Sequence, residues 1–418
     1  MRIGRRWLVT ATSLAAASLM VAGCGSSNSA GGTTPQQGGT AAWAEFSGAS
    51  PNWIFPFVDS SHNSVNSIPQ FQWLMYRPLY WLGNGDQPTL NDSLSLASAP
   101  VYTNNNTTAV INLKSYVWSN GEHVTAQDVQ FWMNMMFAEK ANWANYTPGQ
   151  FPDNVKSVTV NSPTQLTFTL NSTYSSTWFT GDELSQISPM PMAWDKTSDS
   201  AASGSGGCTT DRTKCDAVYQ YLYNKSKNLS TYATDPIWQV VDGPWRLKAF
   251  STDGNVTMVP NPTYSGPVKP KLSQLKELPF TSDAAEYNVL RAGNTINVGS
   301  VPITDLPQRS VTSNNPLPAT NPLPGGKYTL TPNYLWAWSY APINYANPTY
   351  GPALRQLYVR QALQLTIDQN TDDKVAWRGY AVPTTGPIPT VPNTQYVSNL
   401  EQGAGPYAFN INKAKSLL

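Results

Sequence analysis

Cysteine and histidine are the most versatile side chains for chemistry, and this chain has few of them: three cysteines and two histidines in 418 residues. Cys208 and Cys215 stand on either side of six polar residues, directly after the Gly/Ser run at 203–207. In an oxidising compartment this spacing on a polar loop is most simply a disulfide, with two free thiols as the alternative. A metal site is disfavoured, because neither His62 nor His123 has ligand spacing to the cysteine pair.

Motifs of known catalytic chemistry are missing from the sequence. It contains no His-Glu-x-x-His, nucleophile-elbow serine, P-loop or dinucleotide fingerprint. Ser273 and Lys276 fit the Ser-x-x-Lys pattern of penicillin-interacting serine enzymes, but the Lys-Thr-Gly and Ser-Asp-Asn partners are absent. We therefore expect a protein that is not an enzyme and that needs no cofactor or metal. A lipid-anchored hydrolase is the unsupported alternative.

Cys24 ends a segment that is typical of exported proteins. Basic residues at positions 2, 5 and 6 precede an apolar run from Trp7 to Ala22, which is too short for a membrane span. Val21-Ala22-Gly23-Cys24 resembles the bacterial lipobox, in which the cysteine is lipidated and becomes the first residue; an ordinary signal peptide with a chance cysteine is the alternative. We predict a signal peptide at 1–23 and a flexible tether at 24–40, rich in Gly, Ser and Thr.

Composition narrows the class of protein further. Charged residues make up 12% of the chain, against about 25% in typical soluble proteins. The formal net charge is +1 and no Lys/Arg cluster is present, so nucleic acid is a poor electrostatic partner. The hydrophobic fraction of 40%, with 15 Trp, excludes global disorder. The length suits two or three domains.

Hydrophobic periodicity predicts strands that alternate with helices, and so an α/β fold. Apolar residues every three or four positions, after the possible N-cap Thr125 and its partner Asp128, indicate a helix from 126 onward. Asn120-Gly121 is a turn signal, with Trp118 expected to be buried beneath it. The remaining expected elements are strands at 110–113, 157–160, 165–170, 245–247 and 256–259, helices at 283–292 and 358–367, a polar loop at 196–216 and a Pro-rich connector at 302–332.

Several segments, in this order, resemble the family 5 extracellular solute-binding proteins of ABC importers. The sharpest is Ile111–Val129, which is similar to the family signature of a strand, Trp-Ser-Asn-Gly and Thr-Ala-Asp-Asp-Val. The other matching segments are Pro51–Pro56, Met75–Leu79, Asp242–Trp245, Pro260–Tyr264, Val359–Asp368 and Asn412–Leu418. The chain departs from the family pattern at three positions, where Phe55 replaces an Asp, Arg77 replaces a Glu and Gln127 replaces an acidic residue.

The resemblance implies a two-lobed α/β fold of the periplasmic-binding-protein type II, with an extra inserted subdomain and an incomplete second lobe. The implied segments are 41–82 and 196–305 for the first lobe, 83–195 for the inserted subdomain and 306–418 for the second lobe. Family members usually continue beyond the helix that ends this chain. We therefore expect either a fragment of a longer gene product or a chain that binds nothing tightly.

The implied function is capture of a peptide and its delivery to the permease of an ABC importer, by a monomer that is lipid-anchored outside the cytoplasm and does not bind nucleic acid. An oligosaccharide-binding protein of the same fold and a non-transporting envelope scaffold are the alternatives. Phe57, Ser60, Ser61 and His62 belong to a loop that faces the ligand cleft in the family layout. His62 could equally be a surface histidine.

The resemblance implies a second ligand contact at residues 336–340, where the family has a cleft-lining strand of its second lobe. Trp336, Trp338 and Tyr340 alternate along the chain, so in a strand all three rings would lie on one face. Core packing is the alternative. Rings together with amides such as that of Asn344 suit recognition of peptide groups or sugar rings.

Overall fold

The computed structural model describes residues 37–84, 87–309, 321–331, 333–391, 396–399 and 405–418. The predicted signal peptide, Cys24 and most of the predicted tether lie outside the described residues. The first described strand, β1, begins at Thr40.

A four-stranded sheet joins the start of the described chain to residues far along the sequence. Its strands are β1 (Thr40–Ala44), β10 (Gln274–Leu278), β9 (Val256–Pro260) and β8 (Trp245–Phe250), hydrogen-bonded in that order. β1 and β10 are parallel, whereas β10, β9 and β8 are antiparallel neighbours. The predicted strands at 245–247 and 256–259 are therefore confirmed.

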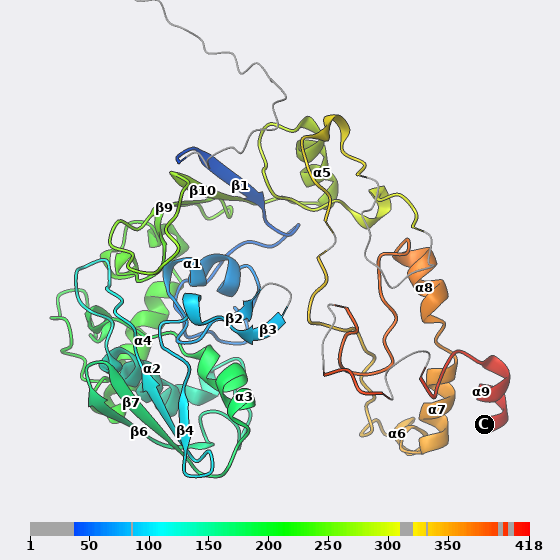
Figure 1. The fold of residues 1–418 in the computed structure, drawn as a ribbon, viewed down its shortest axis with the longest axis horizontal. Helices are drawn as coiled ribbons and strands as arrows, with labels where there is room; N and C mark the ends of the chain where they lie inside the picture. The colour runs from blue at the N-terminus through cyan, green and yellow to red at the C-terminus, as the bar shows by residue number, and fades with distance from the viewer. Residues whose placement is uncertain (1–36, 85–86, 310–320, 332, 392–395, 400–404) are drawn as a thin grey trace, which may run out of the picture. The chain divides into compact units, whose positions relative to one another are not determined.

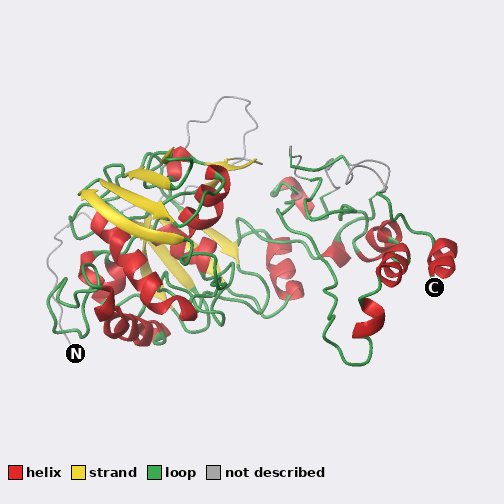
Figure 2. Ribbon diagram, turned by 90° about the horizontal axis from the view of Figure 1, so that it is seen from below, coloured by secondary structure: helices red, strands yellow, loops and turns green. Residues whose placement is uncertain are grey.

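A second four-stranded sheet is antiparallel throughout, and its strands are drawn as yellow arrows in Figure 2. Its order is β4 (Val101–Thr103), β5 (Thr108–Asn112), β7 (Gln165–Leu170) and β6 (Val155–Ser162). Every second residue of β7 is buried, as its alternating sequence predicts. A separate hairpin pairs β2 (Leu82–Asn84) with β3 (Gln87–Leu90).

Helix α2 (Ala126–Glu139) begins where the sequence predicts. Thr125 and Asp128 form the reciprocal capping box, which satisfies backbone N–H groups at the helix start. Trp118 is 1% exposed, and its indole N–H donates to Asp128 at 3.3 Å. The other helices are α1 (Trp73–Met75), α3 (Ser176–Trp178), α4 (Cys215–Ser226), α5 (Asp283–Ala292), α6 (Gly351–Leu354), α7 (Leu357–Leu365), α8 (Gln369–Ala376) and α9 (Ile411–Leu417).

The predicted disulfide between Cys208 and Cys215 is present. Both cysteines are fully buried, and α4 begins at Cys215, so the predicted polar loop ends slightly earlier than expected. The carboxylate of Asp195 accepts hydrogen bonds from the backbone N–H groups of Cys208 and Thr209, each at 3.0 Å. The bridge therefore closes an ordered loop against the core.

Aromatic rings form much of the main core. Phe55 lies between 6.1 and 6.3 Å, ring centre to ring centre, from the side chains of Phe57, Trp194, Tyr219 and Trp238. Many of the Trp, Tyr and Phe side chains in the described residues are therefore buried in the core.

The C-terminal part of the chain is mainly helical in the residues described. α7 and α9 pack together through Ala362, Leu365 and Ala414, which confirms the helices expected there. The expectation of a strand at 336–340 is wrong. This segment has no regular structure, and no described strand pairs with it. Within the described residues, no helix combines the length and apolarity required to cross a membrane.

Candidate functional site

The segment that enters the predicted ligand loop is fixed inside the aromatic core. Trp53 and Phe55 are fully buried, and the side-chain amide of Gln72 donates to their carbonyl oxygens at 3.0 and 3.4 Å. Because these carbonyls would otherwise be buried without a partner, Gln72 stabilises a backbone that forms neither helix nor strand. The loop therefore leaves the core at a defined position.

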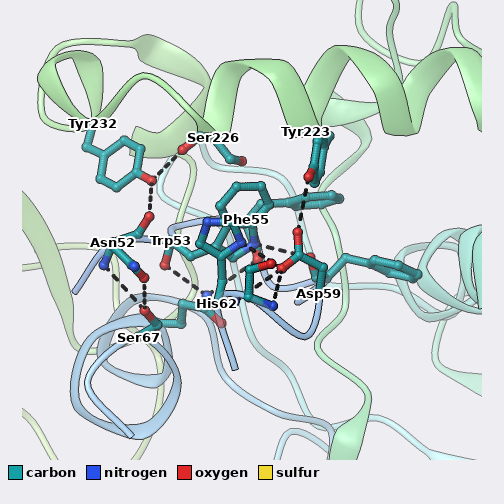
Figure 3. Close-up of polar contacts among 12 residues, drawn as sticks. Asn52, Trp53, Phe55, Asp59, His62, Ser67, Tyr223, Ser226 and Tyr232 are labelled. Carbon is teal, nitrogen blue, oxygen red and sulfur yellow. Dashed lines mark hydrogen bonds and ion pairs between the residues drawn. The ribbon is translucent and has the colours of Figure 1, made fainter. Parts of the chain in front are cut away.

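Asp59 organises the exposed turn that follows. Its Oδ1 accepts from the backbone N–H of Ser61 at 2.8 Å and lies 2.7 Å from Nδ1 of His62. The Tyr223 hydroxyl, from α4, donates to Oδ2 at 3.1 Å. The His62 ring stacks on Trp53 with ring centres 4.1 Å apart, so it is held on both its edge and its face (Figure 3).

The charge on Asp59 decides which ring nitrogen of His62 is available. Burial tends to raise the pKa of Asp59, but the hydrogen bond and charge of His62, with the bonds from Ser61 and Tyr223, outweigh it and hold the pKa below its ordinary value. An ionised carboxylate only accepts hydrogen bonds, so Nδ1 of His62 must carry the proton. In the neutral ring Nε2 is then a hydrogen-bond acceptor, whereas in the charged ring both nitrogens donate.

Helix α4 and its following turn also support the segment that enters the loop, at Asn52. The Tyr232 hydroxyl donates to the carbonyl of Ser226 at 2.5 Å and lies 3.1 Å from that of Asn52. Ser67 completes the contact, because its hydroxyl donates to the Asn52 side chain at 3.0 Å (Figure 3). Asn52, before the loop, is thus joined both to Tyr232 and to Ser67, which follows the loop.

The structure corrects the expected position of Phe57. Its ring is 1% exposed and packs edge-on against Trp143 and Tyr219, so it belongs to the core and is not at the loop surface. Ser60 and Ser61 are exposed and His62 is half-buried, so these three side chains can be reached from solvent.

The predicted aromatic contacts are exposed although the strand is absent. Trp336, Trp338 and Tyr340 are 39%, 42% and 67% exposed, and the rings of Trp338 and Tyr340 lie 4.5 Å apart. Asn344 is exposed, and its side-chain oxygen accepts from the backbone N–H of Ala346 at 3.0 Å. Among the described residues, no hydrogen bond or ring contact joins this segment to His62.

Glu45 and Glu277 form a buried pair of carboxyl groups that the sequence patterns did not predict. Glu45, just after β1, is fully buried and accepts from the Trp43 indole at 3.2 Å and from the Asn66 amide. Glu277 in β10 is 1% exposed, and neither of its carboxyl oxygens has a hydrogen-bond partner. Burial, and then the charge of Glu45, raise the pKa of Glu277 well above its ordinary value. The alternation that places Glu277 on the buried face with Leu275 was the available signal.

Arg77 joins two of the matching sequence segments. Its backbone N–H donates to Asp242 at 2.9 Å, and its guanidinium donates to the Tyr264 hydroxyl at 3.0 Å. The guanidinium also lies over the Trp81 ring, 5.1 Å from its centre. The backbone of Gly243 approaches the same region so closely that a Cβ atom would stand 2.4 Å from the Leu74 carbonyl oxygen. Arg77, Asp242 and Gly243 therefore contribute to packing between these segments.

Residues 93–418 match the model of the bacterial extracellular solute-binding proteins, family 5 Middle. The chain belongs to this family. The resemblance read from the sequence motifs is therefore confirmed. The chain matches no curated protein.

Solved structures of the same fold cover most of this chain. The oligopeptide-binding protein AppA from Bacillus subtilis, in complex with a nonapeptide, is 16% identical with a TM-score of 0.57, and the match covers 92% of this chain and 64% of AppA. The ABC transporter substrate-binding protein CtaP from Listeria monocytogenes is 21% identical with a TM-score of 0.60, and the match covers 91% of this chain and 65% of CtaP. The ABC transporter-associated periplasmic binding protein DppA from Helicobacter pylori, in complex with the peptide STSA, is 18% identical with a TM-score of 0.58. That match covers 92% of this chain and 66% of DppA. These likenesses show the fold, and the chain spans about two thirds of each protein.

Proposed function

We propose that this protein captures peptides outside the cytoplasm and delivers them to the permease of an ABC importer. The observation that carries the proposal is membership of the solute-binding family, together with two structural relatives solved with bound peptides. In such proteins two lobes close over the ligand by a hinge, and closure replaces the water around the ligand with protein groups. A closed form then differs in surface from an open one, which is what a permease can recognise.

In this proposal the loop around His62 contributes polar contacts to the peptide. Nε2 of His62 accepts a hydrogen bond from a peptide N–H or a terminal ammonium, because Asp59 holds the proton on Nδ1. The hydroxyls of Ser60 and Ser61 are exposed beside it and can both donate and accept. The buried ring of Phe57 serves only to support the loop.

The aromatic segment contributes contact area in the same proposal. The rings of Trp336, Trp338 and Tyr340 cover side chains or the flat amides of a peptide, and the Asn344 amide matches its backbone groups. Amphipathic rings lose little conformational entropy on binding, which suits a receptor for varied sequences.

The proposal also includes a lipid anchor. Cys24, after cleavage of residues 1–23, would carry the acyl groups, and the following Gly- and Ser-rich residues would let the folded part move at the membrane surface. The protein would then be bound to the membrane by the anchor alone.

Thermal-shift screening of the protein encoded by the complete gene tests the proposal. We expect peptides of two to ten residues to raise the unfolding temperature, and neutral oligosaccharides to leave it unchanged. A shift with oligosaccharides alone would support the sugar-binding alternative, and no shift with either class would favour a non-transporting scaffold.

A further inference from the structure

Helix α4 presents a second polar face on the side opposite its buried residues. Val218, Tyr219 and Leu222 are buried, whereas Gln220, Tyr221, Asn224 and Lys225 line a groove of about 570 Å³. Residues three or four apart share a face of a helix, so this lining follows from the sequence spacing. The volume lies within the range of about 300–1,000 Å³ that is typical of small-molecule sites.

The one ammonium group among the groove-lining residues is already neutralised. Nζ of Lys225 lies 2.7 Å from Oδ1 of Asp199 and 2.5 Å from Oδ2 of Asp235. The Tyr221 hydroxyl also donates to Asp199, at 2.7 Å. Lys225 and Asp235 are mostly buried, with side chains 18% and 13% exposed, whereas the Asp199 side chain is 75% exposed. The groove therefore carries a formal charge of −1, and both of these contacts to Asp199 use its Oδ1.

This arrangement selects against three classes of ligand. An anion meets a net negative charge and finds the ammonium occupied. A cation finds the place between the two carboxylates filled by Lys225, and only the exposed oxygen of Asp199 remains for it. A large apolar ligand would desolvate the amides of Gln220 and Asn224 without giving them hydrogen bonds.

Neutral hydroxyl-rich molecules match the remaining groups. Their hydroxyls donate to the exposed oxygen of Asp199 and exchange hydrogen bonds with carboxamides, which both donate and accept. The Tyr221 ring offers a flat surface for the C–H face of a sugar ring. We propose that the α4 groove binds a neutral sugar residue, as a site separate from the peptide-binding loop and beyond the proposed transport function.

Ligand-observed NMR on the protein encoded by the complete gene tests this site, with N-acetylglucosamine, cellobiose and putrescine as probes. The variants are Asp199→Asn and Asn224→Ala, and the control is Asp372→Asn, which changes an exposed carboxylate in α8, outside the groove. We expect saturable binding of at least one sugar, weakened at least tenfold by each groove substitution and unchanged in the control. Thermal unfolding of each variant checks that the fold is retained.

Three results would overturn the proposal: no saturable binding of either sugar, sugar binding that survives both groove substitutions, or binding of putrescine that displaces the sugar. The peptide-binding assay separates this site from the proposed function, since Asn224→Ala should leave peptide affinity unchanged. Peptide binding without sugar binding would refute the proposed sugar site and leave the proposed transport function standing.

Discussion

Asp59 and His62 form a hydrogen-bonded pair 2.7 Å apart, in which the ionised carboxylate keeps a proton on Nδ1 of the imidazole. Trp53 beneath the ring and Tyr223 behind the carboxylate hold the pair in one geometry. Such support for a single polar contact is what a ligand-binding loop needs, since a preorganised group loses little entropy on binding.

Replacing Asp59 with Ala should weaken peptide binding and loosen the loop. The carboxylate accepts hydrogen bonds from Ser61, His62 and Tyr223, so its loss should cost about 1–3 kcal/mol of stability. Peptide affinity should fall by about tenfold, because the ring loses its orientation. Titration calorimetry and urea denaturation measure the two effects.

Tyr223→Phe is the matched control for that substitution, since it removes one hydrogen bond to Asp59 and leaves the His62 contact. It should cost about 1 kcal/mol of stability and little affinity. Equal loss of affinity in both variants would mean that the loop, and not the tautomer of His62, governs binding.

Removing the disulfide should destabilise the protein modestly. With Cys208 and Cys215 both replaced by Ala, the free energy of unfolding should fall by about 2–3 kcal/mol, because the bridge closes a short loop. Dithiothreitol should lower the unfolding temperature of the wild type and leave that of the double variant unchanged. Two reactive thiols in unreduced, denatured protein would contradict the bridge.

Stability should fall as pH rises from about 4.5 toward neutrality. The pKa of Glu277 is raised well above its ordinary 4.5, and burial raises the pKa of Asp242 to about 7. A group with a raised folded-state pKa binds its proton more tightly in the folded protein, so its contribution is present below the unfolded pKa and is lost as pH passes the folded one. Each group can contribute a slope of at most about 1.4 kcal/mol per pH unit.

Glu277→Gln keeps the shape of the side chain and removes its titration, so it should flatten this pH dependence. Urea denaturation at intervals from pH 4.5 to 8 compares the variant with the wild type. Parallel curves for the two proteins would show that Glu277 is not protonated in the folded state.

Gly243→Ala should be strongly destabilising, because its Cβ would stand 2.4 Å from the backbone oxygen of Leu74. We expect a loss of about 2–4 kcal/mol, as for other severe steric changes in a core. Gly181→Ala is the control, since its nearest contact would be an ordinary 3.7 Å to the Leu82 side chain. Similar unfolding temperatures for the two variants would contradict the close approach at Gly243.

Local signals predicted much of the fold. The capping residues Thr125 and Asp128 gave the start of α2, and the alternation at 165–170 gave β7 with its buried face. The site was less predictable, because burial depends on distant contacts: Phe57 lies in the core through Trp143 and Tyr219. The alternation at 336–340 predicted a strand, but a strand also needs a hydrogen-bonded neighbour, which no local pattern reports. Glu277 was missed because Glu45 joins it only through the pairing of β1 and β10.

The proposed lipid anchor predicts a specific mass. The first residue of the mature protein should be Cys24, carrying acyl groups on its thiol, in protein extracted from its native membrane. Mass spectrometry of the intact protein measures this. An unmodified terminus at another residue would contradict both the anchor and the cleavage site.

Titration calorimetry with a defined peptide, on the protein encoded by the complete gene, tests the central claim most directly. We predict saturable binding of one peptide per chain, weakened about tenfold by His62→Ala and unchanged by His123→Ala, which alters the exposed second histidine. Failure of every peptide in a library of two to ten residues to bind would contradict the account.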